Sequence, residues 1–344
     1  MEHRRYYQIA GITIQVESEL PITEATFDQK FQSFRVDGPG EDTVVIQHRF
    51  QLPDLGTQDL GTKIYHKAPW MIYQKGRSWI YVGYALIDEG LQRPQRIVMF
   101  NHDHTHGVIH NRFNQAYLQG GLESLTMFPS DQILIARLLA DRFGCYLHSA
   151  GAILDTSGLL FVGHSEAGKS TASKLLLSSH ERMQGDSHSS GQIEILCDDR
   201  NIVRLWNSGW RVHGTWSHGE IPHVSPKSAP LRAILFLTKA EENRLIPLTD
   251  RRNVIRRLLS CLIKPFVTSE WWEKTLVLIE RLAQEIPCYE MQFDTSGKIV
   301  SELYGLKIRI QTATEHYGQE LMADHAASTD LKSENGIHPK TETP

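Results

Sequence analysis

The sequence predicts a mixed α/β protein, in which a β-rich N-terminal region precedes an α/β core and a polar C-terminal tail. Three observations support this fold class. Short alternating or β-branched runs fill roughly the first 115 residues, an apolar run leads through a glycine loop into a helical pattern near residue 163, and two amphipathic patterns follow residue 250. We therefore predict a β-rich domain over 1–128, a core domain over 129–310 and a mostly disordered tail over 311–344.

The composition is that of a soluble globular protein. The chain has 344 residues, of which 40% are hydrophobic and 22% charged, and its formal net charge is −4. This charge gives no electrostatic reason to expect nucleic acid or an anionic membrane as the main partner. No apolar run is long enough for a signal peptide or a transmembrane helix, so we expect a cytoplasmic protein with no membrane partner.

The cysteines agree with a reducing compartment. They are far apart and lack Cys-x-x-Cys or zinc-finger spacing, which predicts free, buried thiols rather than a disulfide or metal framework. They are Cys145, Cys197, Cys261 and Cys288.

In the N-terminal region we expect strands that are separated by turn signals such as Asp37–Gly40 and Lys75-Gly76. The clearest strands by residue pattern are Ile12–Val16, Thr43–Ile46, Trp79–Tyr84 and Arg96–Phe100.

A histidine cluster follows the last of these strands. On an extended strand His102, His104 and His106 would project to one face, where they could ligate a transition metal. The turn formers Asn101, Asp103 and Gly107 favour a polar turn into a strand that begins near Val108. We favour the turn; zinc measured in the purified protein would support the metal site instead.

After Pro129 the period changes to that of a helix. Ser130 is a plausible N-cap for a helix over Asp131–Phe143, which Gly144 ends. Its apolar stripe is Ile135, Leu138 and Leu139, with Leu134 at the edge. Two apolar runs, 146–154 and 159–162, then form a hairpin-like pair.

The next segment has the spacing of a phosphate-binding loop. Gly163, four residues and Gly168-Lys169-Ser170 follow an apolar strand pattern and precede a helical one. Backbone amides of such a loop wrap a polyphosphate, the lysine adds a charge, and the serine hydroxyl ligates Mg²⁺. We therefore predict binding of ATP with Mg²⁺. The expected nucleotide-binding residues are Gly163, Ser165, Glu166, Ala167, Gly168, Lys169, Ser170 and Thr171.

A second motif supplies carboxylates. The apolar run Ile193–Cys197 ends in Asp198-Asp199, and carboxylates at a strand end beside a phosphate loop are where an open α/β sheet places ligand chemistry. The plainer alternative is a solvated strand end. Adjacent residues of an extended chain point opposite ways, so the two aspartates should have separate tasks.

The last third of the core is expected to hold a buried strand, Ala233–Leu237, and helices over Arg251–Ile263 and Glu270–Gln284. The second helix should pack Trp271 or Trp272 and Leu276. The first has a basic face, which is either solvated or a docking face for a phosphoprotein.

Three motifs in this order resemble the HPr kinase/phosphorylase catalytic domain and its relatives in the phosphoenolpyruvate carboxykinase-like nucleotide-binding group. The motifs are Leu147–Gly151, Gly163–Ser170 and Leu196–Asp199. The resemblance implies that Asp198 is the general base toward an acceptor hydroxyl, that Asp199 helps to hold Mg²⁺, and that His148 assists proton transfer. His218 and Glu220 look like further metal or acceptor contacts of kinase-like relatives.

The chain also departs from that family. Glu166 replaces a loop glycine, which is hard to reconcile with a positive φ there. Asp198 lies 198 − 169 = 29 residues after Lys169, with a long polar loop over 184–192, and the N-terminal region does not resemble the family's regulatory domain. These departures indicate a kinase-like relative with its own substrate.

Three functions are therefore open. The first is a kinase that phosphorylates a serine-type hydroxyl of a protein, peptide or small molecule; the second is a carboxykinase acting on a small dicarboxylate. The third is a nucleotide-binding scaffold without turnover. Intact Lys169, Ser170 and both aspartates favour activity. The sequence leaves open the acceptor, a reverse phosphorylase activity and homo-oligomer formation.

Overall fold

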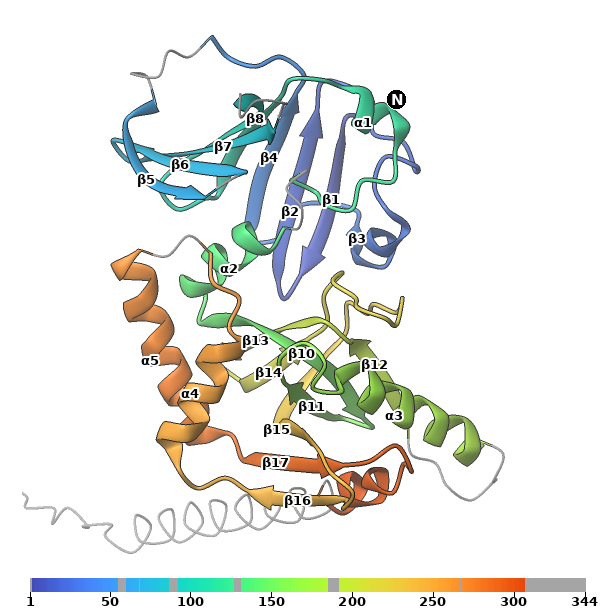
Figure 1. Cartoon of the computed structure of the whole chain (residues 1–344). Helices are drawn as coiled ribbons and strands as arrows, with labels where there is room; N and C mark the ends of the chain where they lie inside the picture. The colour runs from blue at the N-terminus through green and yellow to red at the C-terminus, as the bar shows by residue number, and fades with distance from the viewer. Residues whose placement is uncertain are drawn as a thin grey trace, which may run out of the picture.

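The computed structural model describes residues 2–54, 60–67, 69–86, 92–126, 131–184, 192–265 and 268–306. These residues form a mixed α/β fold, as the sequence predicts, and their strands make two large mixed sheets (Figure 1). The strands of the first sheet come from the N-terminal third of the chain, and those of the second lie between residues 144 and 293. The predicted tail over 311–344 and most of the polar 184–192 loop lie outside the described residues.

The N-terminal sheet has nine strands in the order β3-β1-β2-β4-β9-β8-β7-β6-β5. β2, β4 and β9 run parallel to one another, and the remaining neighbours are antiparallel. All four predicted strands are present. The bounds are β1 Arg4–Ile9, β2 Ile12–Ser18, β3 Arg35–Val36, β4 Thr43–Arg49, β5 Thr62–Lys67, β6 Trp70–Lys75, β7 Ser78–Leu86, β8 Gln92–Phe100 and β9 His106–Asn111; a 3-10 helix η1 spans Gln29–Phe34 and α1 spans Gln115–Gln119.

The histidine cluster forms the predicted turn between β8 and β9. His104 has a positive φ of 60° and is buried, and its Nε2 lies 2.6 Å from the hydroxyl of Tyr81. His102 and His106 are exposed on either side of it. The three rings therefore do not share one face, and the buried ring packs against the aromatic side chains of Phe100 and Trp79 instead.

Two long strands, β10 and β15, connect the two parts of the second sheet. The first parts of both strands pair with β13 and β14, and their later parts join a group in the order β12-β10-β11-β15-β17-β16. In that group β12, β11, β15 and β17 run in the same direction, so their C-terminal ends meet at one edge. The bounds are β10 Gly144–Leu154, β11 Ser157–Val162, β12 Ile193–Cys197, β13 Arg200–Trp206, β14 Gly209–His213, β15 Ser228–Lys239, β16 Arg244–Pro247 and β17 Cys288–Phe293.

Helices flank this sheet, with α3 apart from α4 and α5 (Figure 1). α4 is capped by Asp250 and α5 by Thr268, whose side chains accept hydrogen bonds from first-turn amides, as short polar residues do at helix starts. Trp271 is buried as predicted, but Leu276 faces solvent, so its predicted packing is wrong. The bounds are α2 Gln132–Ala140, α3 Lys169–Gln184, α4 Arg251–Cys261 and α5 Ser269–Glu285.

α2 is shorter than predicted and joins the two halves of the fold. It starts after Asp131, and the predicted N-cap Ser130 lies outside the described residues. The predicted stripe is buried in a hydrophobic cluster that also contains core residues of the N-terminal sheet together with Tyr146 and Trp216. One cluster thus crosses the boundary proposed at residue 128, and the domain limits stay a prediction. Among the described helices, none has the length and apolarity needed to cross a membrane.

Candidate functional site

The register of β10 brings the glycine loop and the aspartates together. β10 lies between β11 and β12, with Ser149 paired to Val162 on one side and Gly151 paired to Cys197 on the other. Because neighbouring strands are about 4.8 Å apart, the loop after β11 and the aspartates after β12 begin about 10 Å apart at one sheet edge. A glycine is required at 151, since a Cβ there would lie 2.4 Å from the side-chain oxygen of Asn201.

The 163–168 loop connects β11 directly to α3, as the sequence predicts. Glu166 has a φ of +66° and Gly168 a φ of +101°. A Cβ at Gly168 would also lie 2.9 Å from the ring of Phe293, so both backbone angle and space favour glycine there. The expectation that Glu166 would not adopt a positive φ is wrong: the residue is exposed and takes the left-handed conformation despite its Cβ.

The amine of Lys169 folds back over this loop. Its Nζ donates hydrogen bonds to the carbonyl oxygens of Gly163 at 3.1 Å and His164 at 3.0 Å, and the residue is only 7% exposed. Burial lowers the pKa of this amine, and the nearby charges of Asp199 and Asp198 oppose that effect. The amine is therefore held against the loop by two of its backbone carbonyls.

Asp198 faces the start of α3. Its carboxylate accepts hydrogen bonds from the hydroxyl of Ser170 at 2.8 Å and from the backbone amides of Gly219 at 2.6 Å and Ile221 at 3.1 Å. The side chain is 1% exposed. Buried carboxylates need such donors, and these three fix both oxygens in place.

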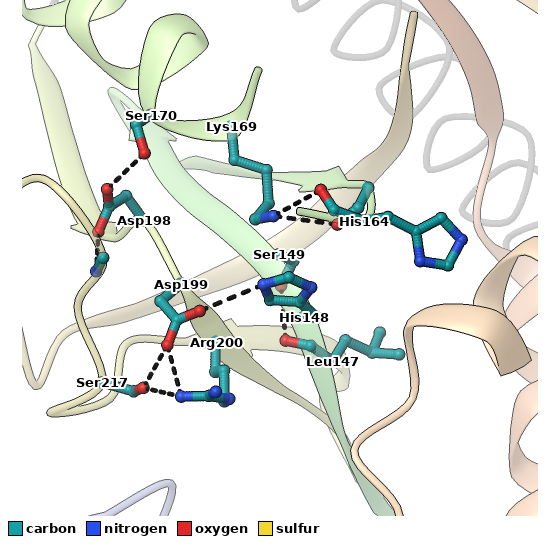
Figure 2. Close-up of polar contacts among 12 residues, drawn as sticks. Leu147, His148, Ser149, His164, Lys169, Ser170, Asp198, Asp199, Arg200 and Ser217 are labelled. Carbon is teal, nitrogen blue, oxygen red and sulfur yellow. Dashed lines mark hydrogen bonds and ion pairs between the residues drawn. The ribbon is translucent and has the colours of Figure 1, made fainter. Parts of the chain in front are cut away.

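Asp199 faces the other way, toward β10 and β13 (Figure 2). It accepts hydrogen bonds from Arg200 and from the hydroxyl of Ser217 at 2.8 Å, and its second oxygen lies 3.3 Å from Nε2 of His148. Burial by itself would raise the pKa of Asp199, but the contacts with His148, Arg200 and Ser217 outweigh burial and lower the pKa. The carboxylate is thus held ionised between two basic side chains.

Sequence reasoning missed several of these groups. Arg200 follows the aspartate pair directly in the sequence, and a basic residue at that position was the signal that could have predicted its contact with an aspartate. Ser217 and the amides of Gly219 and Ile221 come from the segment after β14, whose glycines and titratable residues are more than a spacer requires. Nothing in that pattern says which atoms reach the aspartates.

His218 and Glu220, by contrast, lie at the surface. The carboxylate of Glu220 is 71% exposed and pairs with Lys174 of α3 at 2.8 Å, and the His218 side chain is also exposed. The structure therefore gives no support to Glu220 as a metal ligand. Within the described part of the chain, no group of three or more His, Cys, Asp or Glu side chains is placed to hold a metal ion.

A cavity of about 300 Å³ borders the Asp199 side of this cluster. From the N-terminal region it is lined by Asp28, Lys30 and Glu123. Its other lining residues include Arg200 and Ser217, the two donors to Asp199, together with Tyr146, Trp216, His218, Asp131 and Gln132.

Comparisons with known proteins add little to this picture. No protein-family model matches the chain, and no curated protein matches it. Among solved structures, that of the Hpr(Ser) kinase/phosphatase from Coxiella burnetii is similar with a TM-score of 0.31 and 11% sequence identity, over 52% of this chain and 96% of that one. A likeness this weak suggests at most a distant relationship of fold.

Proposed function

We propose that this protein is an ATP-dependent kinase that transfers the γ-phosphoryl group to a hydroxyl. The observation that carries the proposal is the 2.8 Å hydrogen bond between Ser170, at the first turn of α3, and the buried Asp198 at the end of β12. A hydroxyl and a carboxylate meeting beside a glycine loop and a lysine form the arrangement that phosphoryl transfer needs.

The loop and the start of α3 are assigned to the phosphates. The first amides of a helix lack partners within the helix, and together with the helix dipole they favour an anion. In this chain they follow Gly168, whose positive φ turns the backbone into α3. Lys169 would exchange its hydrogen bonds to loop carbonyls for contacts with phosphate oxygens.

The residues present also fit a magnesium ion. Mg²⁺ is usually held by one or two carboxylates or hydroxyls together with phosphate oxygens, rather than by a cage of protein ligands. Ser170 and Asp198 offer such a pair of oxygen donors. When bound there, the ion would neutralise charge on the transferred phosphoryl group.

This assignment reverses the roles that the family resemblance implies. Asp198, next to Ser170, suits the metal, whereas Asp199 lies 3.3 Å from His148 and suits proton transfer. We assign His148 as the group that accepts the hydroxyl proton and Asp199 as the carboxylate that orients its ring and stabilises the protonated imidazole. Arg200 and Ser217 keep Asp199 in position for this task.

We propose that the acceptor enters through the cavity lined by Arg200 and Ser217. Because His148 and Asp199 do not line it, the acceptor hydroxyl would reach past these two donors to His148. The cavity volume of about 300 Å³ is at the small end of ligand pockets, which favours a small polar molecule or a single side chain over a large apolar ligand. Asp28, Lys30 and Glu123 give the cavity lining charges of both signs. These charges favour an acceptor that is itself polar or charged.

The decisive experiment combines the purified protein with γ-labelled ATP and Mg²⁺, using a cell extract and free L-serine as acceptors. We expect transfer of label to an acceptor by the wild-type protein and its loss in Lys169→Ala. Nucleotide binding without any transfer would favour the scaffold function. Turnover of a small dicarboxylate in place of a hydroxyl would favour the carboxykinase.

A further inference from the structure

The segment that serves both aspartates is anchored by one tryptophan. Trp216 follows β14 and is 4% exposed. Its ring lies 5.2 Å from the ring of Phe31 and 5.3 Å from that of Phe34, both in η1 of the N-terminal region. Aromatic rings at these separations are in direct contact, so the tryptophan is packed against the other half of the fold.

The residues that follow this anchor are those that touch the aspartates. Ser217 donates its hydroxyl hydrogen bond to Asp199, and the amides of Gly219 and Ile221 donate to Asp198. These three donors thus lie within five residues of Trp216. Figure 2 shows Ser217 beside Asp199 and Arg200.

Regular secondary structure does not hold this segment in place. Residues 214–227 have neither helix nor strand, and their backbone is tied at its ends by Gly214 bonding to Lys227 and Ser225 bonding to Leu196. Between these ties Trp216 is the buried aromatic side chain. Thr215, beside it, is also buried, and its hydroxyl donates to the carbonyl oxygen of Arg200 at 2.6 Å and accepts from the amide of Ser217. Because segments with few buried contacts open locally at low free energy, the donors that follow Thr215 depend on the tryptophan contact for their position.

We propose that Trp216 is a positioning residue, and that Phe31 and Phe34 of the N-terminal region hold through it the segment that orients Asp198 and Asp199. The N-terminal region is then part of the active site although it contributes no group to the phosphates. This inference rests on the proposed function, because it assigns Asp198 to the Mg²⁺–nucleotide complex.

The test measures how strongly Mg²⁺ improves ADP binding. Calorimetry on the full chain gives the ratio of the ADP dissociation constant without Mg²⁺ to that with Mg²⁺. We expect Trp216→Ala to lower this ratio by about tenfold, which is the loss of one charge-assisted contact, and Trp216→Phe to keep it within about threefold of wild type. Phe34→Leu, a mild change on the other side of the contact, should lower the ratio by a smaller factor.

Phe100→Ala is the matched control. Phe100 belongs to the same hydrophobic cluster and is similarly buried, but its ring contacts in the described part of the chain are with Tyr81 and His104, away from Trp216 and η1. Its loss should lower the melting temperature without changing the ratio. If Trp216→Ala does not fold, the ratios measured for Trp216→Phe and Phe34→Leu test the inference instead.

Two results would overturn the inference. One is an unchanged ratio in folded Trp216→Ala, or in Phe34→Leu if Trp216→Ala does not fold. The other is an equal fall in Phe100→Ala, which would show a general effect of destabilisation. A wild-type protein that binds ADP equally with and without Mg²⁺ would contradict the proposed function itself. A wild-type ratio well above one with an unchanged ratio in the variants contradicts the positioning role alone.

Discussion

Replacing the two neighbouring aspartates by asparagine, one at a time, is predicted to give two different defects. Asp198→Asn keeps one acceptor oxygen and places an NH₂ group where the other oxygen accepted hydrogen bonds. At least one of the donors at Ser170, Gly219 and Ile221 then loses its acceptor. Because the site is 1% exposed, water does not replace the lost partner.

The size of this defect follows from those contacts. A buried donor without an acceptor costs about 1–3 kcal/mol, so the free energy of unfolding should fall by about that amount. At about 2.1 cal/mol/K of unfolding entropy per residue, the melting temperature of a chain of 344 residues then falls by about 1–2 °C for each kcal/mol. Loss of a charged ligand worth about 1.5–3 kcal/mol should weaken Mg²⁺-dependent nucleotide binding by about tenfold to 150-fold.

Asp199→Asn should instead spare nucleotide binding. Asp199 is partly exposed, so water compensates part of the lost contact with Arg200, and the cost in stability is smaller. Turnover should fall by about 10² to 10⁴, because His148 loses the carboxylate that orients it.

Three measurements distinguish the variants: the Mg²⁺ dependence of ADP binding by calorimetry, phosphoryl transfer from labelled ATP, and thermal unfolding. Equal behaviour of the two variants in binding and turnover would refute the division and leave a joint metal site. Lost turnover with normal Mg²⁺ dependence in Asp198→Asn would restore the roles that the family resemblance implies.

Three further predictions concern single residues. Lys169→Ala should weaken ATP by about tenfold or more in calorimetry, through loss of a charge-assisted phosphate contact; unchanged affinity would end the claim of nucleotide binding. Glu166→Gly should raise the free energy of unfolding by up to about 1 kcal/mol in denaturant titrations, because glycine adopts a φ of +66° without strain, and a clear loss would contradict this. Burial lowers the pKa of His48 from 6.5 to about 4. Below pH 6.5 the unfolded chain therefore gains a proton that the folded chain does not gain. The free energy of unfolding then falls by up to about 3 kcal/mol as the pH approaches 4. Relative to wild type, His48→Gln should flatten the pH dependence of unfolding in this window, and an equal slope would count against a buried neutral histidine.

The elements that the sequence predicted are those whose signals are local. The hairpin of β10 and β11, the glycine loop and α3 follow one another in about 40 residues, and each is marked by its own periodicity or turn chemistry. The ends of α2 were less accurate, since boundaries depend on caps and on packing. Leu276 shows the same limit, because helical spacing alone did not establish which residues at the edge of the α5 stripe are covered.

The groups around the aspartates were not predictable in this way. Trp216 contacts Phe31, which lies 185 residues earlier in the sequence, and no pattern in either segment indicates this contact. The amides of Gly219 and Ile221 act through the backbone, which carries no sequence signal. Such contacts are determined by how the two halves of the fold pack.

The aspartate pair shows where local reasoning ends and packing begins. Alternation along an extended chain correctly separated the two side chains, and the structure places them on different partners. Alternation does not say which side of β12 faces the loop. That choice depends on the register in which β12 pairs with β10, because a slip of one residue would exchange the two faces. In the observed register Asp198 meets Ser170 and Asp199 meets His148. The assignment of metal and proton chemistry to the two carboxylates therefore depends on this register, and exchanged defects in the two variants would contradict it.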